Sequence, residues 1–474
     1  MKKHFFWMMA AIMICGSAVF SACSNDDDSS SSTEESKGGV ARQTFISHAR
    51  ADLKDLAENL NFSSWNLAND INSYFNQYVL NNSEFKQAIA SAFMLQASQT
   101  IKPVEEGSEL AEMGYQMYGI VDFTAFNYRF TMNDEGNGFD VEPADDFEMI
   151  ISAYDPLTER IVPRCLKLTL KAGGSSFLVN MKKLGSDKFA VVGKMPTEFA
   201  FAISTNLSGD WYEVFNGTFK NDVRMDGTSQ YVKKMDAFNI SGIVNSALRS
   251  IDADHKDDAT TATFAIGQDP VTHEAGVQLG FIHNGKEIIQ LRGVMENLNG
   301  MTDYSQHTSA SSIAEAFAIV MAGNNLKEGT ITLLGDLTTT VKVNKCDEVV
   351  RLQNQMASAR RNYADEATID SYTQQLNKLI TCSMTCKGVD QTIPMKLQTT
   401  QLGIDYWASP ALKFPDESDY VTLTDMLDKE SILYMVNIAD HGVEPMKQSI
   451  HVVRQLMQYA QNLMGGIEEK KQAK

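Results

Sequence analysis

Hydrophobic and polar residues follow different periods along the chain, and each period predicts a different kind of element. In residues 43–98, apolar side chains recur at helical spacing, as in Phe45, Ala49 and Leu53. From about residue 115 the spacing changes to two, which is typical of strands, and this pattern continues to residue 345. Helical spacing returns from residue 346. The pattern therefore predicts an α+β fold: a large antiparallel β body with an N-terminal helical part and C-terminal helices.

The helical part consists of three predicted helices with short polar breaks. Ser63 or Ser64 is placed to cap the second helix, and Asn82 is placed to cap the third, which carries Phe85, Ile89, Ala92 and Phe93.

The β body is predicted as short strands joined by turns. Strands are expected at residues 118–130, 147–154, 162–171, 177–182, 199–204, 211–219 and 330–345. Gly173-Gly174 and Asn284-Gly285 are strong hairpin signals, because both pairs reach positive φ at low cost. Asp155-Pro156-Leu157-Thr158 and Asp269-Pro270-Val271-Thr272 share a pattern, which indicates either duplicated modules or chance reuse of a common turn.

The last third of the chain adds helices to this body. Residues 347–363 and 366–379 predict a helical hairpin inserted between the strand that ends at residue 345 and a strand at 380–387, and a further strand is expected at 391–401. An apolar helix is predicted at 310–321. Another begins at Pro445 and carries a broad apolar face that implies burial against the body.

The first residues have the pattern of a secretion signal. Lys2 and Lys3 precede an apolar run at residues 5–19, which is too short to span a membrane, and Ser21-Ala22-Cys23 follows. The end of this segment resembles the lipobox of bacterial lipoproteins, although Phe20 stands where Leu is usual. The resemblance implies cleavage after residue 22 and lipidation of Cys23.

An acidic, Ser-rich stretch follows Cys23 and cannot bury apolar surface, so it is interpreted as a tether. Its Asp26-Asp27-Asp28 cluster resembles the surface-export signal of Bacteroidetes lipoproteins. The chain is then divided into a signal peptide (1–22), a tether (23–42), a helical part (43–112), a β body with a candidate repeat (113–345), and a helical hairpin, strands and C-terminal helix (346–474).

Charge and cysteine content narrow the function classes. The formal net charge is −19, which argues against nucleic-acid partners because phosphates need Lys and Arg. The same charge argues against binding to anionic membrane surfaces, so we expect the protein to reach the membrane through its N-terminal lipid. Four cysteines remain beyond Cys23, and Cys346, Cys382 and Cys386 are candidates for a disulfide, with buried thiols as the alternative. No cofactor or metal site is predicted.

Two aromatic clusters are candidate ligand contacts, one at Trp211 and one at Tyr406 and Trp407, with a core role as the alternative. Trp407 is favoured because its Pro-rich surroundings predict a loop. No nucleophile elbow, phosphate loop or dinucleotide fingerprint occurs, so the sequence does not decide whether the protein is an enzyme.

We expect a lipid-anchored extracytoplasmic binding or interaction protein at the outer membrane and on the cell surface, with the periplasmic face as the alternative location. Its partner is left open among a glycan, an amphiphile and a protein. The alternative functions are a hydrolase with a carboxylate pair and a periplasmic carrier of an amphiphile.

Overall fold

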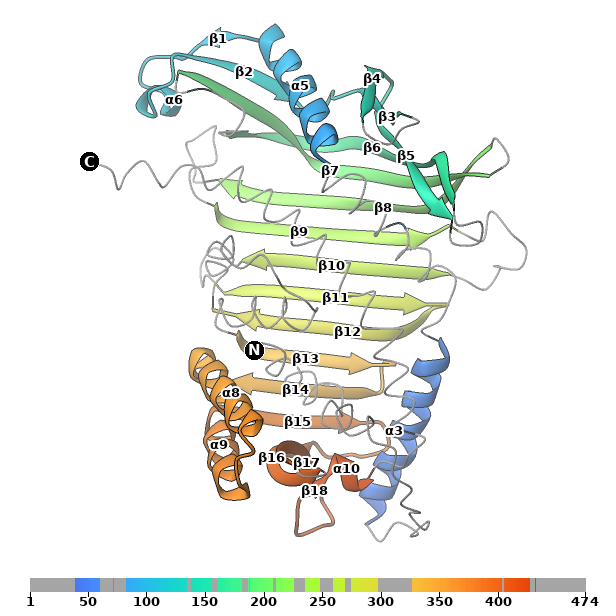
Figure 1. Ribbon diagram of the computed structural model, residues 1–474, viewed down its shortest axis with the longest axis vertical. Helices are drawn as coiled ribbons and strands as arrows, with labels where there is room; N and C mark the ends of the chain where they lie inside the picture. Colours follow the sequence, from blue (N-terminus) through green and yellow to red (C-terminus); the bar gives the residue numbers. More distant parts are fainter. Residues whose placement is uncertain are drawn as a thin grey trace. The chain divides into compact units, whose positions relative to one another are not determined.

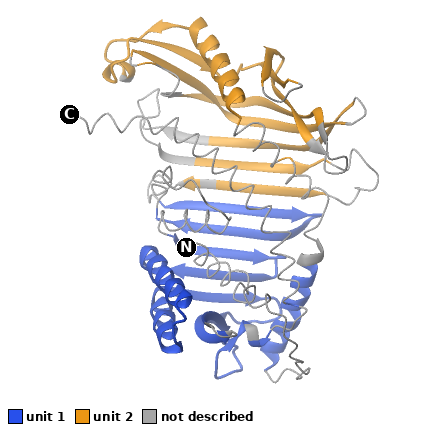
Figure 2. Ribbon diagram, in the orientation of Figure 1, with its two compact units in different colours: residues 1–65, 274–451 blue, residues 66–273, 452–474 orange. Residues whose placement is uncertain are grey.

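The computed structural model describes residues 39–59, 71, 82–133, 138–155, 160–180, 186, 188–207, 210–225, 235–247, 259–268, 274–296, 326–402, 405–426 and 431. The chain divides into two compact units, each described by itself: unit 1 has residues 1–65 and 274–451, and unit 2 has residues 66–273 and 452–474 (Figure 2). The signal, the tether up to residue 38 and the helices predicted at 310–321 and from Pro445 lie outside the described residues, as do the four-residue Asp-Pro turns apart from Asp155. The last residues of the predicted tether, from Val40, belong to a helix.

Unit 2 is built on a sheet centred on two long strands, β6 (Arg160–Asn180) and β7 (Phe189–Leu207). Its other strands are β1 (Lys102–Pro103), β2 (Met117–Asp122), β3 (Tyr128–Met132), β4 (Phe139–Pro143), β5 (Phe147–Asp155), β8 (Asp210–Met225), β9 (Met235–Ser246) and β10 (Thr260–Gln268). β6 pairs with β5 and β7, and β8, β9 and β10 follow in order from β7 (Figure 1).

The sheet of unit 2 is mixed, which corrects the prediction of a purely antiparallel body. The first half of β7 pairs in parallel with β2, and β3 pairs in parallel with β5. Because the second half of β7 pairs with β8 along the same edge, this strand joins two parts of the sheet.

Helix α5 (Ser83–Gln99) packs on β2 (Figure 1). It contributes Phe85 and Phe93 to the aromatic core of unit 2. Asn82 is its N-cap, and the Asn82 side chain accepts hydrogen bonds from the backbone N–H groups of Glu84 and Phe85. The ring centroids of Phe93 and Phe126 lie 5.0 Å apart in the core. On β7, Val191 faces this core. Its neighbours Ala190 and Val192 face a second cluster that includes Leu110 of the short helix α6 (Glu109–Glu112), as the two-residue period of a strand requires.

Unit 1 contains an antiparallel succession of strands. They are β11 (Ala275–His283), β12 (Lys286–Met295), β13 (Leu326–Leu333), β14 (Leu337–Val343), β15 (Ile380–Cys386), β16 (Ile393–Leu402), β17 (Asp405–Leu412) and β18 (Val421–Thr422). Each pairs with the next. Asn284 and Gly285 both have positive φ, at 51° and 78°, and close the β11–β12 hairpin as predicted.

The predicted helical insertion is confirmed. Helices α8 (Cys346–Arg361) and α9 (Glu366–Leu379) lie between β14 and β15, which pair with each other. Helix α3 (Val40–Asn59) belongs to the same unit, where the rings of Phe45 and Phe414 are tilted against each other with centroids 5.5 Å apart. The first turn of α3 donates backbone hydrogen bonds to Asp416 and Glu417, which suits the positive end of a helix dipole. The short helix α10 (Leu423–Met426) follows β18.

Several predicted boundaries are wrong for identifiable reasons. Gly173-Gly174 makes no hairpin: β6 runs through it with a bulge, so the strands predicted at 162–171 and 177–182 are one. The strand predicted at 330–345 is two, because Leu334 and Gly335 turn the chain with positive φ. The strand predicted at 118–130 is interrupted by a turn after Asp122. The β-rich character is confirmed, although the boundary between units after residue 273 divides the predicted body.

Candidate functional site: the polar face of the unit 2 sheet

The sheet of unit 2 has one apolar and one polar face over strands β6–β10. Successive residues of a strand point to opposite faces, so the strand registers assign each side chain. Leu168, Ile203 and Phe215 are paired in sequence across β6, β7 and β8, and all three lie in the core beneath α5. Lys167 and Ser204, one position along, point to the opposite face.

We call this opposite face the polar face. Its members are Lys167, Thr169 and Lys171 of β6; Glu198, Ala200, Ala202, Ser204 and Asn206 of β7; Trp211, Glu213, Asn216, Thr218 and Lys220 of β8; Ser241, Ile243 and Asn245 of β9; and Thr261, Thr263 and Ala265 of β10.

A β-bulge in β8 brings Trp211 and Glu213 to the polar face. The register shifts between Ile203 and Ser204 of β7, so Val214 is an extra residue of β8. Val214 is buried in the core beside Phe215, and Glu213 and Trp211 therefore share a face with Asn216. Simple alternation counted back from Asn216 would have placed them on the apolar face.

Trp211 is half-buried on this face, and Lys167 lies over its indole ring with Nζ 4.8 Å from the ring centroid. This is the geometry of a cation–π contact, which is worth about 0.5–1 kcal/mol at exposed sites. The indole therefore stands on the sheet as a flat apolar surface with a movable cation above it.

A chain of side-chain hydrogen bonds crosses three strands of the polar face. Asn216 Nδ2 donates to Glu213 Oε1 at 2.7 Å, and Asn245 Nδ2 donates to Asn216 Oδ1 at 3.5 Å. The Thr261 hydroxyl donates to Asn245 Oδ1 at 2.9 Å. A carboxylate accepts at two oxygens and an amide nitrogen donates twice, so this array keeps further acceptors and donors at a half-exposed surface.

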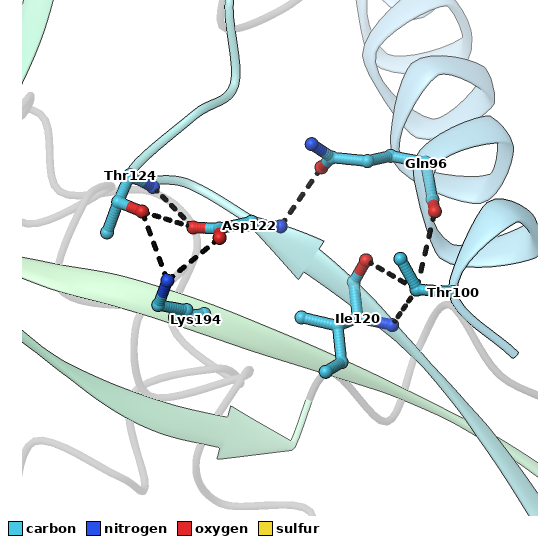
Figure 3. A network of polar contacts seen from close by, with 6 residues as sticks. All are labelled: Gln96, Thr100, Ile120, Asp122, Thr124 and Lys194. Carbon is cyan, nitrogen blue, oxygen red and sulfur yellow. Dashed lines mark hydrogen bonds and ion pairs between the residues drawn. The ribbon is translucent and has the colours of Figure 1, made fainter. Parts of the chain in front are cut away.

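The polar contacts between α5, β2 and β7 are of a different kind, because they satisfy one another (Figure 3). Thr100 Oγ1 accepts from Ile120 N at 2.7 Å and donates to Ile120 O at 3.1 Å, and Gln96 Oε1 accepts from Asp122 N at 3.0 Å. These two side chains complete the outer edge of β2 beyond its short pairing with β1.

Asp122 closes the same network by accepting from Lys194 Nζ at 2.9 Å and from Thr124. Burial acts to raise the pKa of Asp122, but the hydrogen bonds from Thr124 and Lys194 outweigh burial and lower it. The network therefore fixes α5 and β2 to β7, and we assign it a structural role.

Unit 1 has an ionisable cluster beneath α3. Burial raises the pKa of Asp52, and the neighbouring Asp336 adds to this effect, while His48 and Lys286 oppose it. Asp52 Oδ2 is buried without a hydrogen-bond partner. His48 of this cluster lies beside the turn at Gly388, so the cluster is part of the contact between α3 and the rest of unit 1.

The cysteines of the body are thiols in the structure. Cys382 pairs with Val341 of β14, and Cys346 begins α8. The structure joins none of Cys346, Cys382 and Cys386 in the predicted disulfide. Cys382 and Cys386 do share the buried face of β15, as predicted. Burial raises the pKa of Cys382 to about 12 and that of Cys346 and of Cys386 to about 11, so all three stay protonated near neutral pH and are poor nucleophiles.

The second aromatic cluster lies on a strand, which corrects the predicted loop. Tyr406 and Trp407 belong to β17 and are half-buried. The Arg360 guanidinium, at the end of α8, lies over the Trp407 ring. Trp407 therefore anchors α8 to β17, which is a packing role.

Within the described part of the chain, no group of three or more His, Cys, Asp or Glu residues is placed to hold a metal ion. A crevice lined by Asn377, Ile380, Cys382, Met395, Lys396 and Leu397 in unit 1 is small, with room for about one water. Cys23 lies outside the described residues.

The sequence pointed to Trp211 and missed its neighbours on the polar face. The alternation of Leu166, Leu168 and Leu170 with Lys167 and Lys171 was the available signal for β6. For β8 the bulge concealed it.

No protein-family model matches the chain, and neither the curated proteins nor the solved structures contain a match to it. Among the helices of the described ranges, none combines the length and the apolar character needed to cross a membrane.

Proposed function

We propose that the protein is a lipid-anchored extracytoplasmic binding protein of the outer membrane, displayed at the cell surface, whose ligand contacts lie on the polar face around Trp211. Anchoring is supported by the lipobox-like end of the signal at Cys23, and surface display by the acidic cluster that follows it.

The observation that carries the binding role is the hydrogen-bond chain from Glu213 to Thr261 beside the indole of Trp211. A sheet needs one apolar face to pack on a core, whereas its second face can be solvated without any special arrangement of side chains. Here the second face holds an aromatic ring and an ordered set of planar hydrogen-bonding groups. That combination supplies both contact area and orientation to a ligand.

The polar face favours binding over hydrolysis. Glycoside hydrolysis needs two carboxylates about 5–10 Å apart on either side of the scissile bond. The polar face holds Glu198 and Glu213, but Glu198 lies six positions along β7 from Ser204, the partner of Glu213, which is about 20 Å at the rise of a strand.

Cysteine labelling on intact cells tests both display and the orientation of this face. A membrane-impermeant maleimide should label Glu213→Cys on intact cells, because Glu213 is exposed. Val214→Cys is the matched control and should stay unlabelled, since Val214 is 2% exposed on the apolar side. Labelling of Glu213→Cys only after lysis would contradict surface display, and equal labelling of the two variants would contradict the assignment of faces.

The anchor is tested separately with Cys23→Ala, which should remove acyl labelling and release the protein from the membrane fraction. Membrane attachment and acyl labelling that survive this change would overturn the lipoprotein assignment.

A further inference from the structure

The polar face of unit 2 has the chemistry of a saccharide-binding surface, and we propose that it binds a neutral polysaccharide across strands β8–β10, with one sugar ring at Trp211. This inference rests on the proposed binding function and names the class of its ligand.

The hydrogen-bonding groups of the array complement those of a sugar. Sugar hydroxyls donate and accept at once and occur in adjacent pairs, so planar groups with paired atoms suit them best. The array presents one carboxylate and two carboxamides in succession, from Glu213 to Asn216 to Asn245, with a hydroxyl at Thr261. Because these groups already bond to one another, their orientations are fixed before a ligand arrives, which lowers the entropy lost on binding.

The spacing of the array along the polar face matches that of a sugar polymer. Asn216, Asn245 and Thr261 are laterally paired on three consecutive strands. Neighbouring strands lie about 4.8 Å apart, so the array repeats at a distance close to the length of one pyranose ring. A linear polysaccharide lying across the strands would therefore meet an equivalent polar group at each sugar.

The indole ring of Trp211 offers a surface on which a sugar ring can stack. The C–H-rich face of a pyranose is apolar and flat, and a Trp ring offers a large rigid surface of the same kind. Lys167 now lies over the Trp211 ring. Its four-carbon stem allows the ammonium to move aside and donate to a hydroxyl of the stacked sugar.

The charge of the protein favours neutral over acidic polymers. On the face, Lys167, Lys171 and Lys220 stand with Glu198 and Glu213, so the face itself is close to neutral, and the chain as a whole carries a formal charge of −19. A polyanion would approach against this field. A neutral polymer is unaffected by it.

Binding measurements on the full-length protein in detergent test this inference. The probes are gluco-, manno- and galacto-oligosaccharides of six residues, with polygalacturonate as the acidic counterpart and a random peptide library as the protein-like one. We expect at least one neutral oligosaccharide to bind with a Kd below about 1 mM. Trp211→Ala should weaken that binding at least tenfold and Asn245→Ala several-fold. Trp407→Phe, in unit 1, should leave it unchanged.

The outcomes separate the ligand class from the function. Binding of polygalacturonate or of peptides that is lost in Trp211→Ala, with no neutral sugar bound, would overturn the saccharide inference and leave the binding function standing. Neutral-sugar binding unchanged in Trp211→Ala and Asn245→Ala would place the site elsewhere and overturn both. An absence of Trp211-dependent binding to every probe would also overturn both. Circular dichroism and the thermal midpoint of Trp211→Ala and Asn245→Ala, compared with those of the wild type, separate the loss of a contact from misfolding.

Discussion

Replacing Gly119 with Ala should displace α5 from its close contact with β2 in unit 2. A Cβ at this position would lie 2.2 Å from the carbonyl oxygen and 2.8 Å from the carbonyl carbon of Ala97. Both are backbone atoms of the last turn of α5, so no side-chain rotation relieves the overlap. Ordinary contact begins at 3.4 Å, and moving from 2.2 to 3.4 Å displaces the helix by about 1.2 Å.

That displacement would break the bonds that complete the edge of β2. The Thr100–Ile120 bonds, at 2.7 and 3.1 Å, and the Gln96–Asp122 bond, at 3.0 Å, would all lengthen beyond hydrogen-bonding distance. Each is worth about 0.5–1.5 kcal/mol net, and overpacking alone typically costs 1–3 kcal/mol. We therefore expect Gly119→Ala to lower the free energy of unfolding of unit 2 by about 3 kcal/mol.

Hydrogen exchange of the backbone amides of α5 and β2, followed by mass spectrometry, measures this effect locally, since a two-unit protein need not unfold in one step. Gly173→Ala in β6 is the matched control. The nearest atoms to its Cβ, on Glu198, lie 3.9 Å away, and its cost should stay within about 0.5 kcal/mol. Wild-type protection of α5 in Gly119→Ala would show that the helix does not depend on this close approach and would refute the reasoning.

Three further changes probe other contacts. Thr100→Val removes the hydroxyl that bonds to both backbone groups of Ile120. It should lower the free energy of unfolding by about 1–2 kcal/mol and speed hydrogen exchange of the Ile120 amide. Thr100→Ser should retain the protection of this amide, and equal protection in the two variants would contradict this. The pKa of Asp52 is raised, so its contribution to stability is present below about pH 4 and is lost as pH rises through the folded-state pKa. Asp52→Asn should accordingly raise the free energy of unfolding at neutral pH, by less than about 1 kcal/mol after solvent screening, and with it the thermal midpoint. It should also flatten the dependence of stability on pH above pH 4; a lowered midpoint at neutral pH would contradict this. Arg360→Met should shift the fluorescence emission of Trp407 and cost about 0.5–2 kcal/mol, and an unchanged emission spectrum would argue against the stacked geometry.

The helical insertion shows how far local pattern determines structure. Residues 347–363 and 366–379 were predicted within two residues of α8 and α9, because amphipathic spacing and the Asp365 cap act within a single helix. The β11–β12 hairpin was predictable for the same reason, since Asn284 and Gly285 alone set its turn. Gly173-Gly174 misled because a glycine pair suits a bulge as well as a turn, and the pairing partner β7 decides between them.

The sequence by itself determined that the strands of unit 2 have an apolar face and that Trp211 was a candidate contact, and the lipoprotein-like signal at residues 1–23 stays a prediction. Only the tertiary structure decided which residues stand beside Trp211. Glu213 reaches the polar face through a bulge defined by the register with β7, and Asn245 and Thr261 come from strands more than 30 residues further along the chain. Strand pairing is a non-local interaction, and a shift of one residue moves every side chain to the other face. The composition of the polar face is therefore a property of register, which no local pattern encodes.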